Sequence, residues 1–377
     1  MSSTTIFSTD SHVIEPPDLW AGKVDAAYRD RTPRLVPEAG GDWWHVEGER
    51  VLSVNGGTHA GVRFQDPKAL KLEARWAEVI AGAYQPQAKL KDMDTDGIQG
   101  EVIYPTLGMH FFRIPDAGLA RNIMRVYNDW LAEFCKADPK RLKAVALICL
   151  DDIPLAIAEL TRAAKAGLCG AMISVYPSAE RSYDRPEYEA FWAAAAEMAM
   201  PLSLHIATNR TLPPAARTTE DRWSTKVLNT PTAYVTAVNY IEMSLADMLF
   251  SGVFERFPKL RFVSLEYEAG WAPYLIEMMD YTYTQRARRA NWYRFKDGVL
   301  PGDLFRQCVA ISFQEDALAI KLRQEIGVDN LVWGSDYPHQ ESTFPRSREI
   351  LDKVLAGVPQ MEQEKIRGGN AARLYRF

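Results

Sequence analysis

The chain has 377 residues, of which 47% are hydrophobic and 25% are charged, a composition that excludes a disordered or fibrous protein. Its 44 Lys and Arg residues against 49 Asp and Glu residues leave a formal charge of −5, which gives no reason to expect binding to nucleic acid or to an anionic membrane. Four scattered cysteines, and an N-terminus without a basic and then apolar segment, predict a cytoplasmic protein with reduced thiols.

Short β-branched or apolar runs alternate along the chain with longer stretches of helical periodicity. This alternation is typical of parallel strands joined by crossover helices. The predicted strands span residues 6–10, 100–104, 142–150, 170–175, 201–205, 260–266, 308–313 and 330–336. The predicted helices span residues 117–137, 154–166, 188–198, 234–250, 272–284, 316–326 and 346–355.

Eight such units predict an α/β fold of the TIM-barrel class, (β/α)8, as a single domain over residues 1–377. An open doubly wound sheet is the main alternative, but no G-x-G-x-x-G or G-x-x-x-x-G-K motif is present. Two insertions follow strands 1 and 5: about 18–85, with a hairpin around Glu47 and Gly48, and about 207–231. Because barrel active sites lie at the C-terminal ends of strands, we expect a lid or wall there, or else an oligomer interface.

Polar side chains stand at the C-terminal ends of four predicted strands. Asp10 and His12 end the first strand, His205 the fifth, Glu266 the sixth and Asp336 the eighth. Asp10 and His12 are two residues apart, so on an extended strand their side chains share a face, as two ligands of one cation must. Nitrogen and oxygen donors together suit Zn, Mn or Fe(II) better than Ca or Mg.

Further polar residues near these strand ends are candidates for catalysis or substrate binding. His339 lies three residues after Asp336, close enough to act as a proton shuttle. His110 follows the second strand, where substrate contact and a structural role in the loop are equally plausible. Arg113 and Arg210 are candidates for binding a carboxylate, against the alternative of structural arginines.

The ordered set of motifs resembles the amidohydrolase superfamily, in the amidohydrolase-2 branch related to aminocarboxymuconate-semialdehyde decarboxylase and γ-resorcylate decarboxylase. The resemblance spans the chain, and the ordered set is specific although D-x-H alone is not. The residues that carry it are Thr9-Asp10-Ser11-His12-Val13-Ile14-Glu15-Pro16, His205, the segment EYEAGWAP from Glu266 to Pro273, Trp333-Gly334-Ser335-Asp336-Tyr337-Pro338-His339, and Asn370-Ala371-Ala372-Arg373-Leu374-Tyr375.

This resemblance implies a distorted barrel whose divalent metal ion is held by Asp10, His12, His205 and Asp336. Many relatives begin with H-x-H, so the acidic first position of this chain makes the site more anionic. Where decarboxylating relatives tend to have His-Gly-Gly-Gly on the sixth strand, this chain has Glu266-Tyr267-Glu268-Ala269-Gly270, so a mechanism that needs that His does not transfer. Glu15 and Glu266 are possible additional ligands, which leaves one or two ions open.

Three functions are open at this point, and the sequence favours the first of them. The first is a metal-dependent hydrolase of an amide, ester or thioester, with Asp336 as general base and His339 or Glu266 assisting the leaving group. The second is a non-oxidative decarboxylase of an aromatic or unsaturated acid, with Asp336 protonating the carbon that loses carbon dioxide. The third is a non-catalytic binder, which would be expected to lack a ligand, whereas all four are present. In each case we expect a small-molecule ligand and a homo-oligomer.

Overall fold

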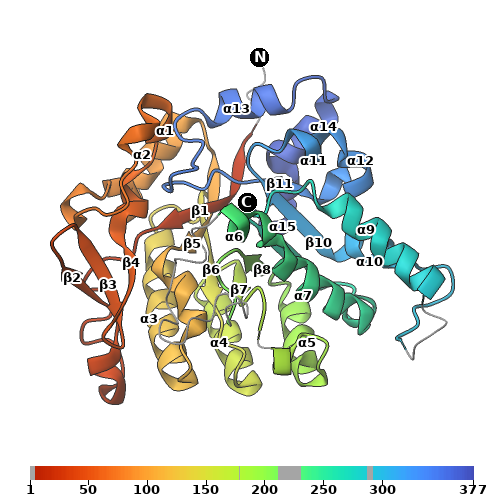
Figure 1. Ribbon diagram of the computed structural model, residues 1–377, viewed down its shortest axis with the longest axis horizontal. Helices are drawn as coiled ribbons and strands as arrows, with labels where there is room; N and C mark the ends of the chain where they lie inside the picture. Colours follow the sequence, from red (N-terminus) through yellow and green to blue (C-terminus); the bar gives the residue numbers. More distant parts are fainter. Residues whose placement is uncertain (1–4, 178, 211–230, 287–291) are drawn as a thin grey trace.

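Eight parallel strands form a barrel in the computed structural model, which describes residues 5–177, 179–210, 231–286 and 292–377 (Figure 1). The strands neighbour one another in chain order, so each crossover leads to the next strand of the barrel. Their bounds are β1 (Phe7–Val13), β5 (Gly100–Pro105), β6 (Leu142–Leu147), β7 (Gly170–Ile173), β8 (Leu202–His205), β9 (Phe262–Leu265), β10 (Val309–Phe313) and β11 (Leu331–Trp333). Each overlaps one predicted strand, and the predicted TIM-barrel class is confirmed.

The barrel is nearly closed where its first and last strands meet. The chain just after β11 runs beside β1: the backbone N–H groups of Ser335 and Asp336 both donate to the carbonyl of Asp10, at 3.0 and 2.9 Å. A single parallel bridge between Ser11 and Tyr337 continues this contact. The closure therefore brings the polar ends of the first and eighth strands directly together.

Helices cover the outside of the barrel (Figure 1). The longer ones are α2 (Pro86–Asp96), α3 (Ala117–Cys135), α4 (Ile153–Lys165), α5 (Glu189–Met198), α7 (Val238–Phe250), α9 (Ala272–Tyr281), α10 (Pro301–Cys308) and α13 (Ser347–Val354). The shorter ones are α1 (Val62–Gln65), α6 (Pro231–Thr236), α8 (Val253–Arg256), α11 (Ala317–Lys321), α12 (Arg323–Ile326), α14 (Gln360–Glu364) and α15 (Asn370–Tyr375). Among the described residues, no helix is long and apolar enough to cross a membrane.

The first insertion contains a small antiparallel sheet of β2 (Arg34–Pro37), β3 (Asp42–Val46) and β4 (Glu49–Ser53). Glu47 and Gly48 join β3 to β4 with φ angles of 54° and 81°, which is the left-handed pair that a two-residue hairpin turn requires. The hairpin was predicted, whereas the third strand was not. Most of the second insertion, residues 211–230 of the predicted 207–231, lies outside the described residues.

The helices deviate more from prediction than the strands do. Residues 234–250 divide into α6 and α7, and residues 316–326 divide into α11 and α12. Helix α2 was not predicted, because its buried face includes the charged side chain of Lys89 beside Met93, which removes the apolar periodicity that identifies a helix.

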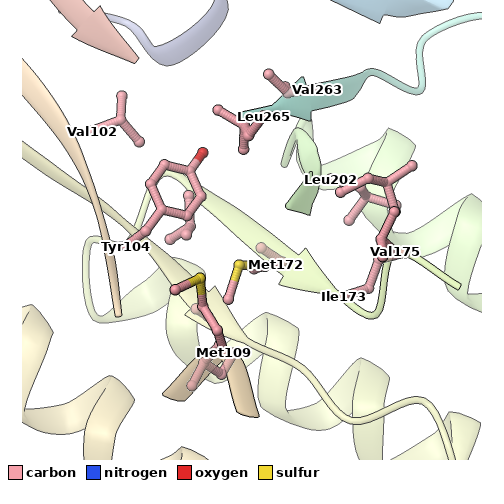
Figure 2. Close-up of a cluster of buried hydrophobic side chains, with 14 of the residues drawn as sticks. Val102, Tyr104, Met109, Met172, Ile173, Val175, Leu202, Val263 and Leu265 are labelled. Atoms are coloured by element: carbon pink, nitrogen blue, oxygen red, sulfur yellow. The ribbon is translucent and has the colours of Figure 1, made fainter. Parts of the chain in front are cut away.

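Apolar side chains from neighbouring strands fill the inside of the barrel (Figure 2). Tyr104 of β5 is fully buried there, and its hydroxyl contacts the hydroxyls of Ser203 and Tyr375 at 2.8 and 3.2 Å. The ring of Tyr104 lies 6.1 Å from that of His12 and 5.5 Å from that of His205, between centroids. The ring of Tyr104 therefore lies at the end of the barrel core, next to the imidazole rings of His12 and His205.

Candidate metal centre

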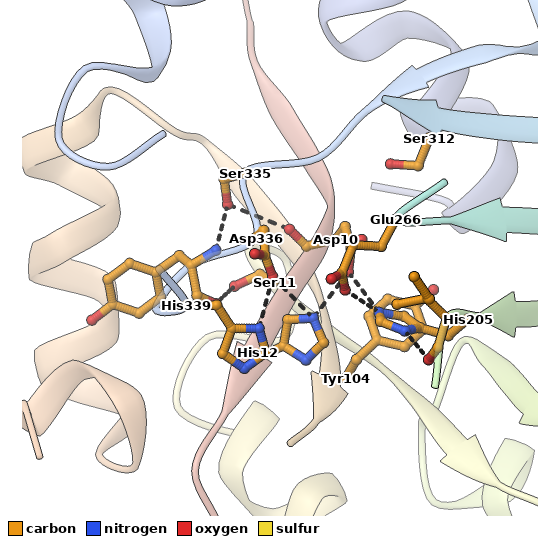
Figure 3. A network of polar contacts seen from close by, with 12 residues as sticks. Asp10, Ser11, His12, Tyr104, His205, Glu266, Ser312, Ser335, Asp336 and His339 are labelled. Atoms are coloured by element: carbon orange, nitrogen blue, oxygen red, sulfur yellow. Dashed lines mark hydrogen bonds and ion pairs between the residues drawn. The ribbon is translucent and has the colours of Figure 1, made fainter. Parts of the chain in front are cut away.

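The predicted ligand side chains converge at the C-terminal end of the barrel (Figure 3). The Nε2 atom of His12 lies 3.3 Å from Asp10 Oδ1 and 3.4 Å from Asp336 Oδ1. The Nε2 atom of His205 lies 3.4 Å from Asp10 Oδ1 and 3.4 Å from Glu266 Oε2. Donor atoms that surround one transition-metal ion at about 2.1 Å are separated by roughly 3.0–3.5 Å, so this spacing suits a single cation.

Hydrogen bonds fix both imidazoles with a free nitrogen toward the centre of the group. Nδ1 of His12 lies 2.8 Å from the carbonyl oxygen of Pro105, and Nδ1 of His205 lies 3.0 Å from that of Ile206. A carbonyl only accepts, so each Nδ1 carries a proton and each Nε2 is directed at the centre of the group. Each Nε2 faces carboxylate oxygens, an arrangement that needs a positive charge, which either a metal ion or a proton on His205 can supply.

Four buried atoms of the group have no hydrogen-bond partner among the described residues: Asp10 Oδ1, His12 Nε2, His205 Nε2 and Asp336 Oδ2. Buried polar atoms without partners are rare, and four of them facing one point indicate a missing positive charge. The residues present therefore fit a divalent transition-metal ion.

The backbone is specialised at the strand ends that supply the carboxylates. Glu266 and Asp336 have φ angles of 63° and 53°, in the left-handed region that non-glycine residues rarely adopt. Gly334 lies against Asp10, and a Cβ atom at Gly334 would come within 2.5 Å of the Asp10 Cβ atom. Only glycine allows the eighth strand to approach the first this closely.

Charge is unevenly distributed over the two imidazoles. Burial lowers the pKa of His12 to about 3, so this ring is neutral. Burial also opposes the charged form of His205, but the negative charges of Asp10 and Glu266 outweigh it and raise the pKa of His205 to about 9. In the same way, burial alone would raise the pKa of Asp10, but the His205 charge, followed by the close approach of both imidazoles, lowers it.

Asp336 forms a hydrogen-bonded chain with His339 and Thr106. Oδ1 of Asp336 lies 2.8 Å from His339 Nδ1, and His339 Nε2 lies 2.9 Å from Thr106 Oγ1. Burial and then the charge of Asp10 raise the pKa of Asp336 well above its usual value, while burial lowers the pKa of His339 to about 4. Thr106 was not predicted as a site residue, because an isolated Thr after a strand has no distinctive pattern.

A buried ion pair that the sequence did not reveal supports the strand that carries Asp10 and His12. Lys89 of α2 and Glu101 of β5 pair at 3.0 Å with almost no solvent exposure. Lys89 also donates to Ser11 Oγ at 2.8 Å and to the His12 carbonyl at 3.1 Å. The charged residue within the apolar run EVIYP was the only sequence signal for this pair.

Glu15 lies outside the ligand group, although it was considered as a possible ligand. Its two carboxylate oxygens accept hydrogen bonds from the backbone N–H groups of Leu107 and Gly108, at 3.0 and 2.9 Å. These residues begin the 3-10 helix η6 (Leu107–Arg113). Glu15 therefore anchors the segment that follows β5, and we remove it from the ligand set.

The three predicted substrate residues occupy different environments. Arg210 pairs with Asp151 at 2.5 Å and donates to the Phe112 carbonyl at 2.8 Å, so its charge is already balanced. His110 and Arg113 are both buried on η6, and Arg113 has no carboxylate partner among the described residues.

Comparison with known proteins identifies relatives of this chain. A sequence profile of the Amidohydrolase family matches residues 86–377. A γ-resorcylate decarboxylase from Rhizobium sp. (strain MTP-10005) is 27% identical over 309 residues, covering 77% of this chain and 86% of the relative. A γ-resorcylate decarboxylase from Rhodococcus jostii (strain RHA1) is 26% identical over 325 residues, covering 80% of this chain and 91% of the relative.

Solved structures share the fold. An amidohydrolase from Mycobacterium avium subsp. paratuberculosis K-10 covers 98% of this chain and 97% of its own, with a TM-score of 0.78 and 22% identity. A dihydroxybenzoic acid decarboxylase from Polaromonas sp. JS666, with bound manganese and the inhibitor 2-nitroresorcinol, covers 99% and 97%, with a TM-score of 0.67 and 19% identity. The chain thus has a group of side chains able to hold a divalent metal, as the manganese-bound structure does. The profile match over most of the sequence shows that the chain belongs to the Amidohydrolase family.

Proposed function

We propose that this protein is a metal-dependent, non-oxidative decarboxylase of an aromatic carboxylic acid. The observation that carries the proposal is the Asp336–His339 pair beside the metal-binding group, which can deliver a proton to a carbon atom. The named relatives, which are decarboxylases, support this function over hydrolysis, the reaction that we first favoured from the sequence.

The proposed metal ligands are Asp10, His12, His205 and Asp336, with Glu266 as a further candidate. Glu266 converges with Asp10, His12 and His205 in one set of donors, and with His12, Asp336 and His339 in a second set. A divalent cation there would orient oxygen substituents of the substrate and stabilise the negative charge that develops during the reaction. Tyr104 closes the site from below with its ring against both imidazoles, which keeps water out of the barrel interior.

Decarboxylation requires one proton, and the chain has a path for it. When the carbon–carbon bond to the carboxylate breaks, its electron pair stays on the ring carbon and carbon dioxide leaves. A proton from the Asp336 carboxyl group then forms the new C–H bond. His339 returns its Nδ1 proton to Asp336 through their 2.8 Å contact and takes up a proton from solvent at Nε2 by way of the Thr106 hydroxyl, which lies 2.9 Å away.

Hydrolysis is the second candidate, and Glu266 is the observation that favours it. Its carboxylate stands where decarboxylating relatives tend to have a His, and its Oε2 atom lies 3.4 Å from His205 Nε2. An extra carboxylate at a metal site helps to activate water, with Asp336 then acting as general base.

Turnover in labelled water separates the two reactions. The manganese-loaded protein is incubated with a panel of hydroxylated aromatic monocarboxylic and dicarboxylic acids, and in parallel with aryl amides and esters. We expect stoichiometric carbon dioxide and one solvent deuterium on the product carbon in ²H₂O, read by NMR. Solvent ¹⁸O in the product without carbon dioxide would establish hydrolysis instead. The Asp336→Asn variant is the control, because carbon dioxide that it releases does not come from catalysis by the Asp336 carboxyl group.

A further inference from the structure

Arg113 is a buried cation without an acidic partner among the described residues. Its side chain is at the end of η6 and only 5% exposed. One guanidinium nitrogen donates to the Ala207 carbonyl at 3.2 Å, while its buried Nε atom has no hydrogen-bond partner. Within the described residues, no Asp or Glu pairs with it. Buried charges are normally paired, because an unpaired one carries a large desolvation penalty.

The charge of Arg113 persists despite this environment. Burial lowers its pKa only to about 10, so the guanidinium is cationic at neutral pH. Arg210 provides the contrast, since Asp151 neutralises it at 2.5 Å. A buried cation that no acidic side chain of the described residues neutralises indicates that a negative charge arrives with a ligand.

The position of Arg113 places that ligand group near the metal-binding cluster. Ala207, which accepts its hydrogen bond, comes two residues after His205 at the same end of the barrel. Helix η6 starts directly after Thr106, whose hydroxyl contacts His339. Because Glu15 holds the first amides of η6, Arg113 is fixed in place rather than free to find a partner.

The surroundings of Arg113 suit an aromatic anion. Nδ1 of His110 lies 3.5 Å from a guanidinium nitrogen of Arg113, at the limit of a hydrogen bond. Burial, followed by the Arg113 charge, lowers the pKa of His110 to about 3, so this ring is neutral and keeps a donor N–H at Nε2. Tyr240 is close enough to affect the pKa of Arg113, and its ring packs 5.7 Å from that of Tyr176.

We propose that Arg113, assisted by His110, binds a second anionic substituent of the substrate, a carboxylate that is retained through the reaction. This inference rests on the proposed decarboxylase function. A guanidinium bound to the departing carboxylate would stabilise the charge that this group loses as carbon dioxide forms, and would slow the reaction. A retained carboxylate keeps its charge, so binding it orients the substrate without this penalty. The substrate class is therefore an aromatic dicarboxylate.

Ligand binding tests this subsite without requiring turnover. Benzoate and benzene-1,3-dicarboxylate are titrated into manganese-loaded protein by calorimetry. We expect wild type to bind the dicarboxylate at least tenfold more tightly than benzoate. Arg113→Met should abolish this preference and Arg113→Lys should keep part of it. Arg210→Met removes an already neutralised guanidinium and should leave the preference in place.

Thermal unfolding adds a readout that a structural role would not produce. Arg113→Met should raise the Tm of the ligand-free protein, because it removes an uncompensated buried charge, while it reduces the shift caused by the dicarboxylate. An unchanged preference in Arg113→Met, or no preference in wild type, overturns the subsite. Carbon dioxide release from monocarboxylates alone would refute the dicarboxylate class but leave the decarboxylase function intact.

Discussion

Lys89 and Glu101 form a 3.0 Å ion pair on the side of β1 that faces away from the metal-binding group. Ser11 points toward this pair, because successive side chains of a strand alternate between its two faces and Asp10 and His12 point to the other face. The three hydrogen-bonding contacts of Lys89, to Glu101, Ser11 and the His12 carbonyl, use all three donors of its ammonium group. The pair thereby ties α2, β1 and β5 together under the ligands.

Removing one member of this pair should strongly destabilise the protein. Lys89→Met leaves Glu101 buried without its cation, and we expect a loss of about 3–5 kcal/mol in the free energy of unfolding. Urea unfolding measures it. Lys136→Met, which breaks the exposed pair with Glu133, is the control and should change stability by less than about 1 kcal/mol. A loss equally small for Lys89→Met would contradict the structural role of the pair.

Metal binding should depend on the two imidazoles and reach one ion per chain. The two sets of side chains that can hold a cation share His12 and Glu266, and we expect them to bind one ion between them. We expect elemental analysis to give one manganese per chain in wild type and little metal in a His12→Ala/His205→Ala double variant. The double variant retaining full metal would refute the ligand assignment. An exchange-coupled manganese EPR signal in wild type would indicate a second ion.

Glu15 should make stability fall as pH rises. Burial raises the pKa of Glu15 from 4.5 to about 7, so between these values the folded state holds a proton that the unfolded state has lost. Stability from this group is therefore fully present below pH 4.5 and declines up to about pH 7. Glu15→Gln cannot titrate, so its stability relative to wild type should rise by up to about 3 kcal/mol from pH 4.5 to 8. Urea unfolding at several pH values checks this, and a constant difference would contradict it.

The strands and the convergence of polar residues at their ends were predictable from the sequence for a common physical reason. A buried strand of a parallel barrel is a short apolar run, and a polar residue at its C-terminal end has no packing role. Asp10, His205 and Asp336 are polar residues of this kind, and the barrel topology brings the ends of their strands together. Helix α2 was missed for the opposite reason, since a buried Lys89 makes its inner face look polar.

The partners of individual charged residues were not predictable. The sequence offers Arg113 and Arg210 as equal candidates for binding a carboxylate, yet Asp151 pairs with Arg210 and not with Arg113. Glu15 was considered as a possible additional ligand, but its carboxylate accepts hydrogen bonds from the backbone amides of Leu107 and Gly108. These outcomes depend on contacts between residues far apart in the chain, which no local pattern encodes.

Asp336 and His339 should have different roles in proton transfer. In the proposed reaction Asp336 donates a proton to carbon and His339 resupplies it, so the two side chains are not equivalent. Asp336→Asn removes the acid and should lower kcat by about 10²- to 10⁴-fold, with carbon dioxide release and carbon deuteration falling together.

His339→Gln leaves the acid in place and should lower kcat less, with an effect that weakens as the pH falls and solvent keeps Asp336 protonated. Steady-state rates across pH, with the metal content of each variant measured in parallel, distinguish these outcomes. Because Asp336 is also a proposed ligand, a rate loss counts toward proton transfer only in samples reconstituted to wild-type metal content. Near wild-type kcat in Asp336→Asn protein with full metal would exclude Asp336 as the acid. The proton donor would then be His339, whose Nδ1 atom lies 2.8 Å from the Asp336 carboxylate in the wild-type protein.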